Sequence, residues 1–250
     1  MSGPAVAFDA ITKRYGARVV VDRVSLEIAG GSFVALVGTS GAGKSTLLKT
    51  INRLVVPEEG RVTIAGEDVA SRDPAKLRRA IGYVFQNVGL FPHMDVAANI
   101  AIAARLAGGS ADVGALLESV GLPASYATRE PRQLSGGEQQ RVGVARALAG
   151  GAELMLMDEP FGALDPVTRA TLGETYRALH DRLGLTTIMV THDMSEALLL
   201  ADRVLVMTNG RVAGDASPRA ILSGEGGPEA AALADVPRRQ AARLRALEAE

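Results

Sequence analysis

The sequence predicts an α/β fold, because short β-like runs alternate along the chain with longer helical patterns. Several of the short runs are apolar throughout, which is typical of parallel strands buried on both faces of a sheet. The clearest strands are expected at residues 33–37, 61–65, 81–85, 154–157, 187–190 and 203–207. Together these runs predict a sheet that contains parallel strands, with helices in the connections.

Three helices are predicted between the strands. The first follows Lys44, where apolar side chains recur near one helical face, namely Leu47, Leu48, Ile51 and Leu54. The second begins near Glu138 and continues to about residue 148. The third follows Pro166, since proline is well suited to the first turn of a helix.

Two smaller units are expected beside this core. Residues 6–28 carry strand and turn signals without a helical pattern, which predicts a small antiparallel sheet. Residues 96–149 are mostly helical in pattern, with breaks at residues 108–109 and 121–123, and predict an inserted helical subdomain. A hinge is expected at residues 224–228. The chain is therefore divided into a main domain over residues 4–222 and a helical tail over 223–250, which is either a surface helix or an interaction segment.

Composition limits the possible functions. Lys and Arg number 27 and Asp and Glu 28, so the formal charge of −1 gives no indication of a nucleic-acid partner. The chain has no Cys, which excludes disulfides and thiolate metal sites, and its three His make a histidine-built metal site a poor expectation. No apolar run approaches the ~20 residues that span a bilayer, and the start lacks a secretory signal. We expect a cytoplasmic chain that reaches a membrane only through a partner.

A phosphate-binding loop is predicted between the strand at 33–37 and the helix after it. The residues fit the pattern G-x-x-x-x-G-K-[ST] and are followed by Thr46; they are Gly38, Thr39, Ser40, Gly41, Ala42, Gly43, Lys44 and Ser45. The glycines permit unusual backbone angles, so that successive N–H groups can face phosphate oxygens at a helix N-terminus. Lys44 can reach the terminal phosphates, and the Ser45 hydroxyl can bind Mg²⁺. The alternative is a Gly-rich turn that matches by chance.

An acidic pair, Asp158 and Glu159, follows the apolar run at residues 154–157. A buried strand there would bring both carboxylates to the carboxyl edge of the sheet, where open α/β folds bind ligands. Asp158 is the candidate Mg²⁺ ligand, directly or through a water, and Glu159 would be free to polarise an attacking water. An acidic pair at a strand end is otherwise often only a solvated terminus, so this hypothesis depends on the phosphate loop.

A second Gly-rich turn opens the helix near Glu138, with the sequence Leu134, Ser135, Gly136, Gly137, Glu138, Gln139 and Gln140. It is an anion-site candidate by the same physics, but the chain has one Lys-bearing phosphate loop. One economical arrangement is a two-fold homodimer, in which this turn closes on a nucleotide that the other copy holds.

These motifs, in this order, resemble the nucleotide-binding subunit of ATP-binding cassette (ABC) transporters. Residues 134–140 are similar to the signature motif of that superfamily, and the resemblance extends from about residue 5 to 222. It implies a P-loop NTPase (RecA-like) core with an antiparallel β subdomain and an inserted α-helical subdomain. It also implies ATP and Mg²⁺ as cofactors.

The resemblance assigns roles to further residues. Tyr15 lies where the family stacks an aromatic ring on adenine, and Gln86 matches the glutamine that links Mg²⁺ and the attacking water to the membrane partner. Residues 163–165 resemble the loop that touches the opposite subunit. His192 resembles the switch histidine and would hold the γ-phosphate. Taken singly, Tyr15 would be a surface aromatic, Gln86 unremarkable and His192 a structural histidine.

The predicted reaction is ATP hydrolysis by in-line attack of water, with Lys44, Gln86, Glu159 and His192 as catalytic residues and Ser45, Gln86 and Asp158 at the metal. Tyr15, the phosphate loop and Thr46 would bind the nucleotide. Catalysis is expected to rest on positioning more than on proton abstraction. The partner copy would complete the site from the other side with Ser135, Gly136, Gly137 and Gln139.

The resemblance is strongest to importers of quaternary-amine osmoprotectants such as glycine betaine, choline and proline betaine. It rests on residues 48–69 and 89–94. In such importers the segment 86–94 forms a groove for a short helix of the integral-membrane permease, although a loop packed internally would have the same composition. A solute-binding protein would act indirectly, and the chain would lie on the cytoplasmic face of the plasma membrane through the permease.

Other functions stay open. Importers of polar amino acids, methionine or phosphate are close competitors. A cassette ATPase acting on ribosomes or DNA is disfavoured, because the interval from Lys44 to Ser135 has no room for long coiled coils and the chain has one cassette of nearly neutral charge. A nonhydrolytic scaffold is disfavoured by the intact Lys44, Asp158, Glu159 and His192.

Overall fold

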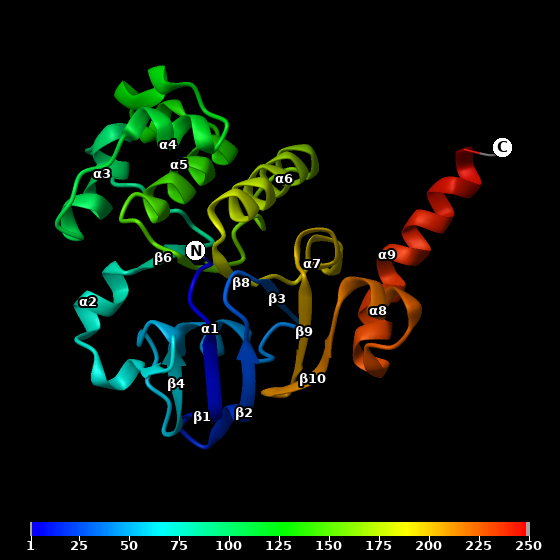
Figure 1. Cartoon of the computed structure of the whole chain (residues 1–250). Coiled ribbons are helices and arrows are strands. Elements are labelled where there is room, and N and C mark those ends of the chain that lie inside the picture. Colours follow the sequence, from blue (N-terminus) through cyan, green and yellow to red (C-terminus); the bar gives the residue numbers. More distant parts are fainter. Residues whose placement is uncertain (1, 249–250) are drawn as a thin grey trace.

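The computed structural model describes residues 2–248 and is built on a six-stranded sheet (Figure 1). In spatial order its strands are β10 (Arg211–Ala216), β9 (Arg203–Thr208), β3 (Phe33–Val37), β8 (Thr186–Val190), β7 (Leu154–Asp158) and β6 (Ile81–Val84). The strands from β9 to β6 are parallel, and β10 pairs with β9 antiparallel. The parallel sheet expected from the apolar runs is therefore present.

The central strand β3 shows why these runs are apolar throughout. Phe33, Ala35 and Val37 belong to one hydrophobic core, and Val34 and Leu36 belong to a second core on the other face of the sheet. Successive side chains of a strand point to opposite faces. A strand with a core on both sides therefore has no position left for a polar residue.

One of these cores lies between the main sheet and a second, antiparallel sheet. The second sheet has the order β2 (Arg18–Ile28), β1 (Val6–Tyr15), β4 (Glu59–Ile64) and β5 (Glu67–Asp68). Helix α1 (Lys44–Ile51) packs its apolar face into this core through Leu47, Leu48 and Ile51. The predicted strand at 61–65 thus belongs to the antiparallel sheet. Leu54, expected on the apolar face of the helix, lies beyond its end and is exposed, because Asn52 caps α1.

Helices cover the other face of the main sheet. They are α5 (Gly136–Leu148), α6 (Pro166–Leu183) and α7 (Met194–Leu200). The helical subdomain at the upper left of Figure 1 adds α3 (Val96–Leu106), α4 (Val113–Ser119) and two 3-10 segments (Ala124–Thr128 and Pro131–Gln133). The predicted breaks follow α3 and α4, where Gly108 and Gly121 adopt positive φ. Helix α2 (Pro74–Arg79) and a 3-10 turn (Val69–Ser71) precede β6.

The C-terminal part of the described chain comprises α8 (Pro218–Ser223) and α9 (Gly227–Glu248). Gly224 ends α8 in a left-handed conformation, within the predicted hinge. Ala230 and Ala234 of α9 are buried in the core against α7, α8 and β10, and the later turns extend away from the domain (Figure 1). Residues 249–250 of the predicted tail lie outside the described residues. The domain limits at 222 and 223 stay a prediction.

None of the described helices combines the length and the hydrophobicity that a membrane crossing requires.

His180 on α6 is buried and gives the fold a pH dependence. Its Nδ1 lies 2.9 Å from the Thr187 hydroxyl, and its ring packs on Phe33. Burial, and secondarily the charge of Arg177, lower the pKa of His180 below its ordinary 6.5. The unfolded chain therefore binds the proton more readily, and the free energy of unfolding falls as the pH drops through 6.5. Thermal unfolding at pH 7.5 and 5.5 should show a smaller decrease in Tm for His180→Asn than for the wild type.

His93 provides the control for this measurement, since its side chain is exposed. His93→Asn should keep the full decrease in Tm. Equal pH dependence in His180→Asn and the wild type would contradict the assignment to His180.

Candidate active site

The phosphate loop joins the carboxyl end of β3 to the N-terminus of α1, and close packing requires glycine at its ends. Gly43 has φ +101° and precedes the first turn of α1. A Cβ there would lie 2.3 Å from the carbonyl oxygen of Val20, and a Cβ on Gly38 would lie 2.2 Å from that of Met207. Both contacts are with backbone atoms, so the loop is fixed against β2 and β9 in a form that side chains would prevent.

Lys44 lies inside this loop. Its ammonium donates to the carbonyl oxygens of Gly38 and Thr39 at 2.8 and 2.9 Å. Burial lowers the pKa of Lys44, and the charges of Glu159 and Asp158 oppose that shift. A cavity of about 250 Å³ lies over the loop, and its lining consists of Val20, Ser40, Gly41, Ala42, Gly43, Lys44, Ser45, Thr46 and Glu159. The expected phosphate ligands thus share one cavity with a carboxylate.

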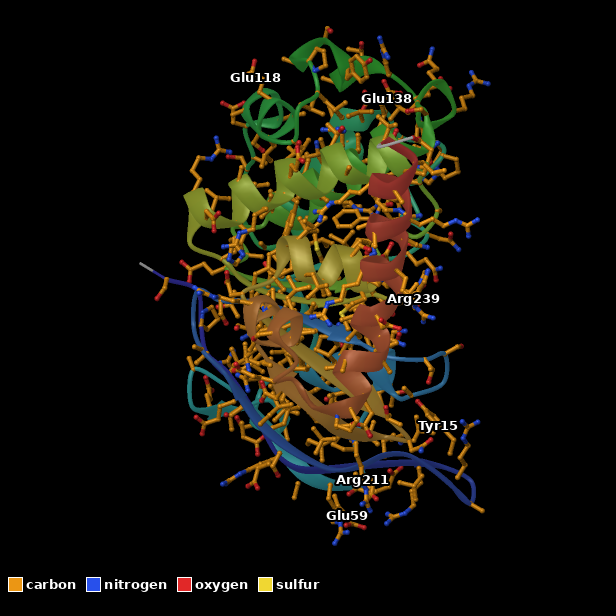
Figure 2. All side chains as sticks on the ribbon, turned by 90° about the vertical axis from the view of Figure 1, so that its right-hand side faces the viewer. Tyr15, Glu59, Glu118, Glu138, Arg211 and Arg239 are labelled. Carbon is orange, nitrogen blue, oxygen red and sulfur yellow. The ribbon has the colours of Figure 1, made fainter. Side chains whose placement is uncertain are left out.

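Tyr15 stands at the end of β1, opposite Arg18 on β2. Tyr15 is 53% exposed, and the Lys13 ammonium lies 5.3 Å from the centroid of its ring. A Cβ on Gly41 would lie 3.6 Å from Nη2 of Arg18, so this hairpin reaches the phosphate loop. Figure 2 places Tyr15 at the margin of the antiparallel sheet. Tyr15 is therefore an exposed aromatic side chain near the phosphate loop, and its stacking on adenine stays a prediction.

Asp158 at the end of β7 collects three polar side chains. Its Oδ1 accepts from the Ser45 hydroxyl at 2.6 Å, and its Oδ2 lies 2.8 Å from the ammonium of Lys49 and 3.3 Å from the hydroxyl of Tyr83. Burial raises the pKa of Tyr83, and the Asp158 carboxylate adds to that shift. A hydroxyl and a carboxylate in contact are oxygen donors of the kind that Mg²⁺ prefers. The donor set fits this cation.

Glu159 brings the remaining predicted residues together. Its Oε2 accepts from the Gln86 amide at 3.3 Å and lies 3.2 Å from Nδ1 of His192. Glu159 has φ +50°, a conformation that costs free energy for a non-glycine residue and occurs often at functional sites. Its backbone N–H donates to the carbonyl oxygen of Val190 at 2.9 Å, so Glu159 stays attached to β8 despite this conformation.

The second Gly-rich turn lies at the start of α5. The Ser135 side chain caps the helix, and the Glu138 carboxylate accepts from the Ser135 N–H at 2.7 Å. The Tyr126 hydroxyl also donates to Glu138 at 2.8 Å, and the bonds from Ser135 and Tyr126 lower the pKa of Glu138. Gln139 donates to the carbonyl oxygens of Pro131 and Leu134. The amide of Gln139 therefore braces its own turn.

The two glycines of this turn differ in their surroundings. A Cβ on Gly137 would lie 2.4 Å from Cγ2 of Thr168 on α6. A Cβ on Gly136 would have no atom within 4 Å. Gly137 therefore permits the packing of α5 on α6, and Gly136 leaves the turn open to approach from outside.

The structure thus brings together Lys44, Ser45, Asp158, Glu159, Gln86 and His192 at one edge of the sheet. Residues 135–139, all of which the structure describes, do not line the cavity over the phosphate loop of their own chain. Their role in binding stays a prediction that a second copy must satisfy.

Two neighbours of Asp158, Lys49 and Tyr83, were not predicted from the sequence. Lys49 follows Ser45 by four residues, and that spacing on a helix places both side chains on one face. The spacing alone was a usable signal. Tyr83 reaches Asp158 only because β6 pairs with β7, and strand order leaves no mark in the sequence.

Comparisons with known proteins identify the family of this chain. A family model described as "ABC transporter" matches residues 21–162. The chain is 47% identical over 221 residues to the carnitine transport ATP-binding protein OpuCA of Listeria monocytogenes. This alignment covers 86% of this chain and 56% of that protein. It is 46% identical to the glycine betaine uptake system ATP-binding protein YehX of Escherichia coli, over 87% of this chain and 72% of that protein. The chain thus spans little more than half the length of OpuCA.

The fold is also similar to that of a solved ATP-binding cassette. A dimeric, post-hydrolysis structure of the ATP-binding cassette MJ0796 with ADP and Pi aligns at a TM-score of 0.77 and 33% identity, over 86% of this chain and 99% of that one. The cassette fold expected from the motifs is confirmed. Since the family model covers more than half of the chain and both curated relatives align over more than four fifths of it, this chain belongs to the ABC transporter family.

Proposed function

We propose that this chain is the ATP-hydrolysing subunit of an ABC importer, which dimerises around two ATP molecules and drives the uptake of a small solute. The convergence of Gln86 and His192 on one oxygen of Glu159, beside the Lys44 loop, carries the proposal. Family membership and the ATP-binding relatives support ATP as the nucleotide.

Nucleotide binding is assigned to the loop from Gly38 to Thr46. Its N–H groups and Lys44 would contact the phosphates, and Tyr15 would stack on adenine. Ser45, Gln86 and Asp158 would hold Mg²⁺, which would neutralise phosphate charge when bound. The carbonyl oxygens that now accept from Lys44 would give way to phosphate oxygens, since a charged acceptor forms the stronger bond.

Hydrolysis is assigned mainly to positioning. Glu159 would orient the attacking water, because its carboxylate faces the cavity and is held by Gln86 and His192. His192 would turn to the γ-phosphate, and Lys44 would stabilise the charge on it. These interactions fix the water and the phosphate in line, which is the main requirement of phosphoryl transfer.

A second copy is assigned the other side of each nucleotide. Ser135, Gly136, Gly137 and Gln139 would complete the site, with Gly136 offering an unobstructed backbone and Gln139 keeping the turn in shape. The dimeric form of a structural relative supports a homodimer.

Coupling to a permease is assigned to the loop at residues 86–94. Beside it lies a cavity of about 480 Å³, lined in part by Phe85, Val88, Phe91 and Leu106. Phe85 and Phe91 are 45% and 40% exposed, which favours a docking groove over a loop packed internally. Arg146 donates to the carbonyl oxygens of Val88 and Gly89, so the wall of the groove is held by α5.

Phe85 and Asn87, which line this groove, flank Gln86, whose amide donates to Glu159. A permease helix bound in this groove would therefore influence the position of the attacking water. We assign the chain to the cytoplasmic face of the membrane, attached through integral-membrane permease subunits and served indirectly by a solute-binding protein. Neither nucleic acid nor ribosomes are assigned as partners.

The solute is proposed to be a quaternary-amine osmoprotectant of the glycine betaine, choline or proline type, because the relatives named above serve carnitine and glycine betaine. Polar amino acids, methionine and phosphate are the alternatives. A strain that lacks this gene should take up labelled glycine betaine, choline or carnitine at least about fivefold more slowly, and wild type but not Lys44→Ala should restore the rate.

Labelled methionine, glutamine and phosphate are the matched solutes in that experiment. Loss of uptake for one of these, with the amines unaffected, would move the chain to another importer class. Co-purification with ribosomes or DNA instead of a polytopic membrane protein would overturn the importer assignment.

A further inference from the structure

Arg169 on α6 joins two loops that meet at the candidate active site. Its Nη2 donates to the carbonyl oxygen of Leu164 at 3.1 Å, in the loop at 163–165. Its Nη1 donates to Oδ2 of Asp193 at 3.3 Å, and its Nε lies 3.5 Å from Oε1 of Glu196. One guanidinium therefore connects the turn before α6 to the turn before α7.

The turn before α7 carries His192, and its neighbours form a closed ring of contacts with Arg169. The Thr191 hydroxyl donates to Oε2 of Glu196 at 2.6 Å and accepts from the Asp193 N–H at 3.0 Å. Asp193 also accepts from the Ser195 N–H at 2.8 Å and so caps α7. Both residues beside His192 are fixed by this ring, whereas the imidazole stays exposed and reaches Glu159.

This ring of contacts contains two carboxylates, Asp193 and Glu196, and depends on the positive charge of Arg169. Glu196 is 9% exposed, and burial raises its pKa, with the Thr191 hydroxyl and Arg169 acting against that shift. Removing the guanidinium would leave Asp193 and Glu196 together with no positive charge between them, in a half-buried position. Uncompensated carboxylates of this kind rearrange or take up a proton. Either change alters the contacts that hold Thr191 and Asp193, the residues on the two sides of His192.

We propose that Arg169 is a positioning residue that holds His192 within reach of Glu159 and ties it to the loop at 163–165. A displacement of that loop would then move the histidine through a single side chain. The inference rests on the proposed function for its effect on hydrolysis, but the position of His192 can be measured without it.

Arg177 is the matched control, because it lies on the same helix and makes contacts of the same kind. It donates to the carbonyl oxygen of Leu200 and pairs with Asp202 and Asp181, at 2.9, 2.8 and 2.7 Å. It thus ties α6 to the far end of α7. Arg169→Gln and Arg177→Gln remove equal charge and similar bonds, and they differ in contact with the His192 turn.

Imidazole NMR signals report the position directly, since the chain has three histidines, His93, His180 and His192. Arg169→Gln should shift or broaden the His192 signal and leave those of His93 and His180 in place. Arg177→Gln should move His180 instead, raising its pKa, because the Arg177 charge helps to lower it. An unchanged His192 signal in Arg169→Gln would overturn the proposal.

Kinetics supply the second readout. Arg169→Gln should lower kcat for ATP hydrolysis by about tenfold or more with KM within about twofold, and Arg169→Lys should recover part of the loss because it keeps the charge. Arg177→Gln should retain kcat within about twofold. Equal losses in the two Gln variants would reduce Arg169 to a structural role and contradict the proposal.

The NMR and kinetic measurements distinguish failure of the proposed function from failure of this inference. Absence of hydrolysis in the wild type would reject the proposed function, while the His192 signal would still decide the inference. Should Arg169→Gln fail to fold, the same NMR comparison is made on Arg169→Lys. There the lost fork geometry must still displace the His192 signal, and an unmoved signal would refute the role.

Discussion

Glu159→Gln is expected to lower the ATP turnover of this chain by about 1000-fold while leaving its ATP affinity within about twofold. The amide keeps the size of the native side chain, but it removes the negative charge that faces the cavity and replaces one acceptor oxygen with an NH2 donor. Lys44, which is assigned to phosphate binding, donates to the carbonyl oxygens of Gly38 and Thr39 rather than to this carboxylate. Phosphate release and calorimetric ATP titration measure the two quantities.

Glu153→Gln is the matched control for this variant. Glu153 is exposed at the opposite end of β7, one residue before the strand begins, and should show wild-type turnover. Turnover near the wild-type rate in Glu159→Gln would show that the carboxylate is not what orients the water. A parallel loss of ATP affinity would instead place Glu159 in binding.

The strands and the phosphate loop were predictable because their signals are local. The strand at 33–37 has the observed limits, and the loop and α1 follow it without interruption. Strand β10 and helices α2 and α8 were not predicted from the sequence, although they also had signals. Asn209 and Gly210 both have positive φ in the turn between β9 and β10, and an Asn-Gly pair is a strong hairpin signal. An Asp or Ser before Pro opens α2 and α8, at residues 73–74 and 217–218.

Which residues meet in space was predictable only in part. Asp158 and Glu159 were placed correctly at a sheet edge, because a run of apolar residues ends there. The pairing of Tyr83 with Asp158 needs the order of β6 and β7, and the bridge made by Arg169 needs the packing of α6 on α7. Neither contact produces a periodic pattern in the sequence. Membership of the strand at 61–65 in the antiparallel sheet was hidden for the same reason.

Gly43→Ala is expected to weaken ATP binding on the order of 100-fold, or ~3 kcal/mol. At φ +101° an alanine is strained, and its methyl group would lie 2.3 Å from the Val20 carbonyl oxygen, a backbone atom of β2 that cannot rotate away. The loop must therefore leave the sheet, and the N–H groups at the start of α1 lose their common direction. Isothermal titration with ATP and Mg²⁺ measures the loss.

Gly66→Ala separates backbone strain from loss of the phosphate site. Gly66 also has positive φ, at +80°, but a Cβ there would meet no atom within 4 Å, and it lies in the turn between β4 and β5. Both variants should lower Tm, because alanine is strained at either position, and only Gly43→Ala should lose ATP affinity. If Gly43→Ala binds ATP as the wild type does, the loop at 38–45 is not the site that holds the phosphates, since no relaxation can admit that methyl group while keeping the present backbone.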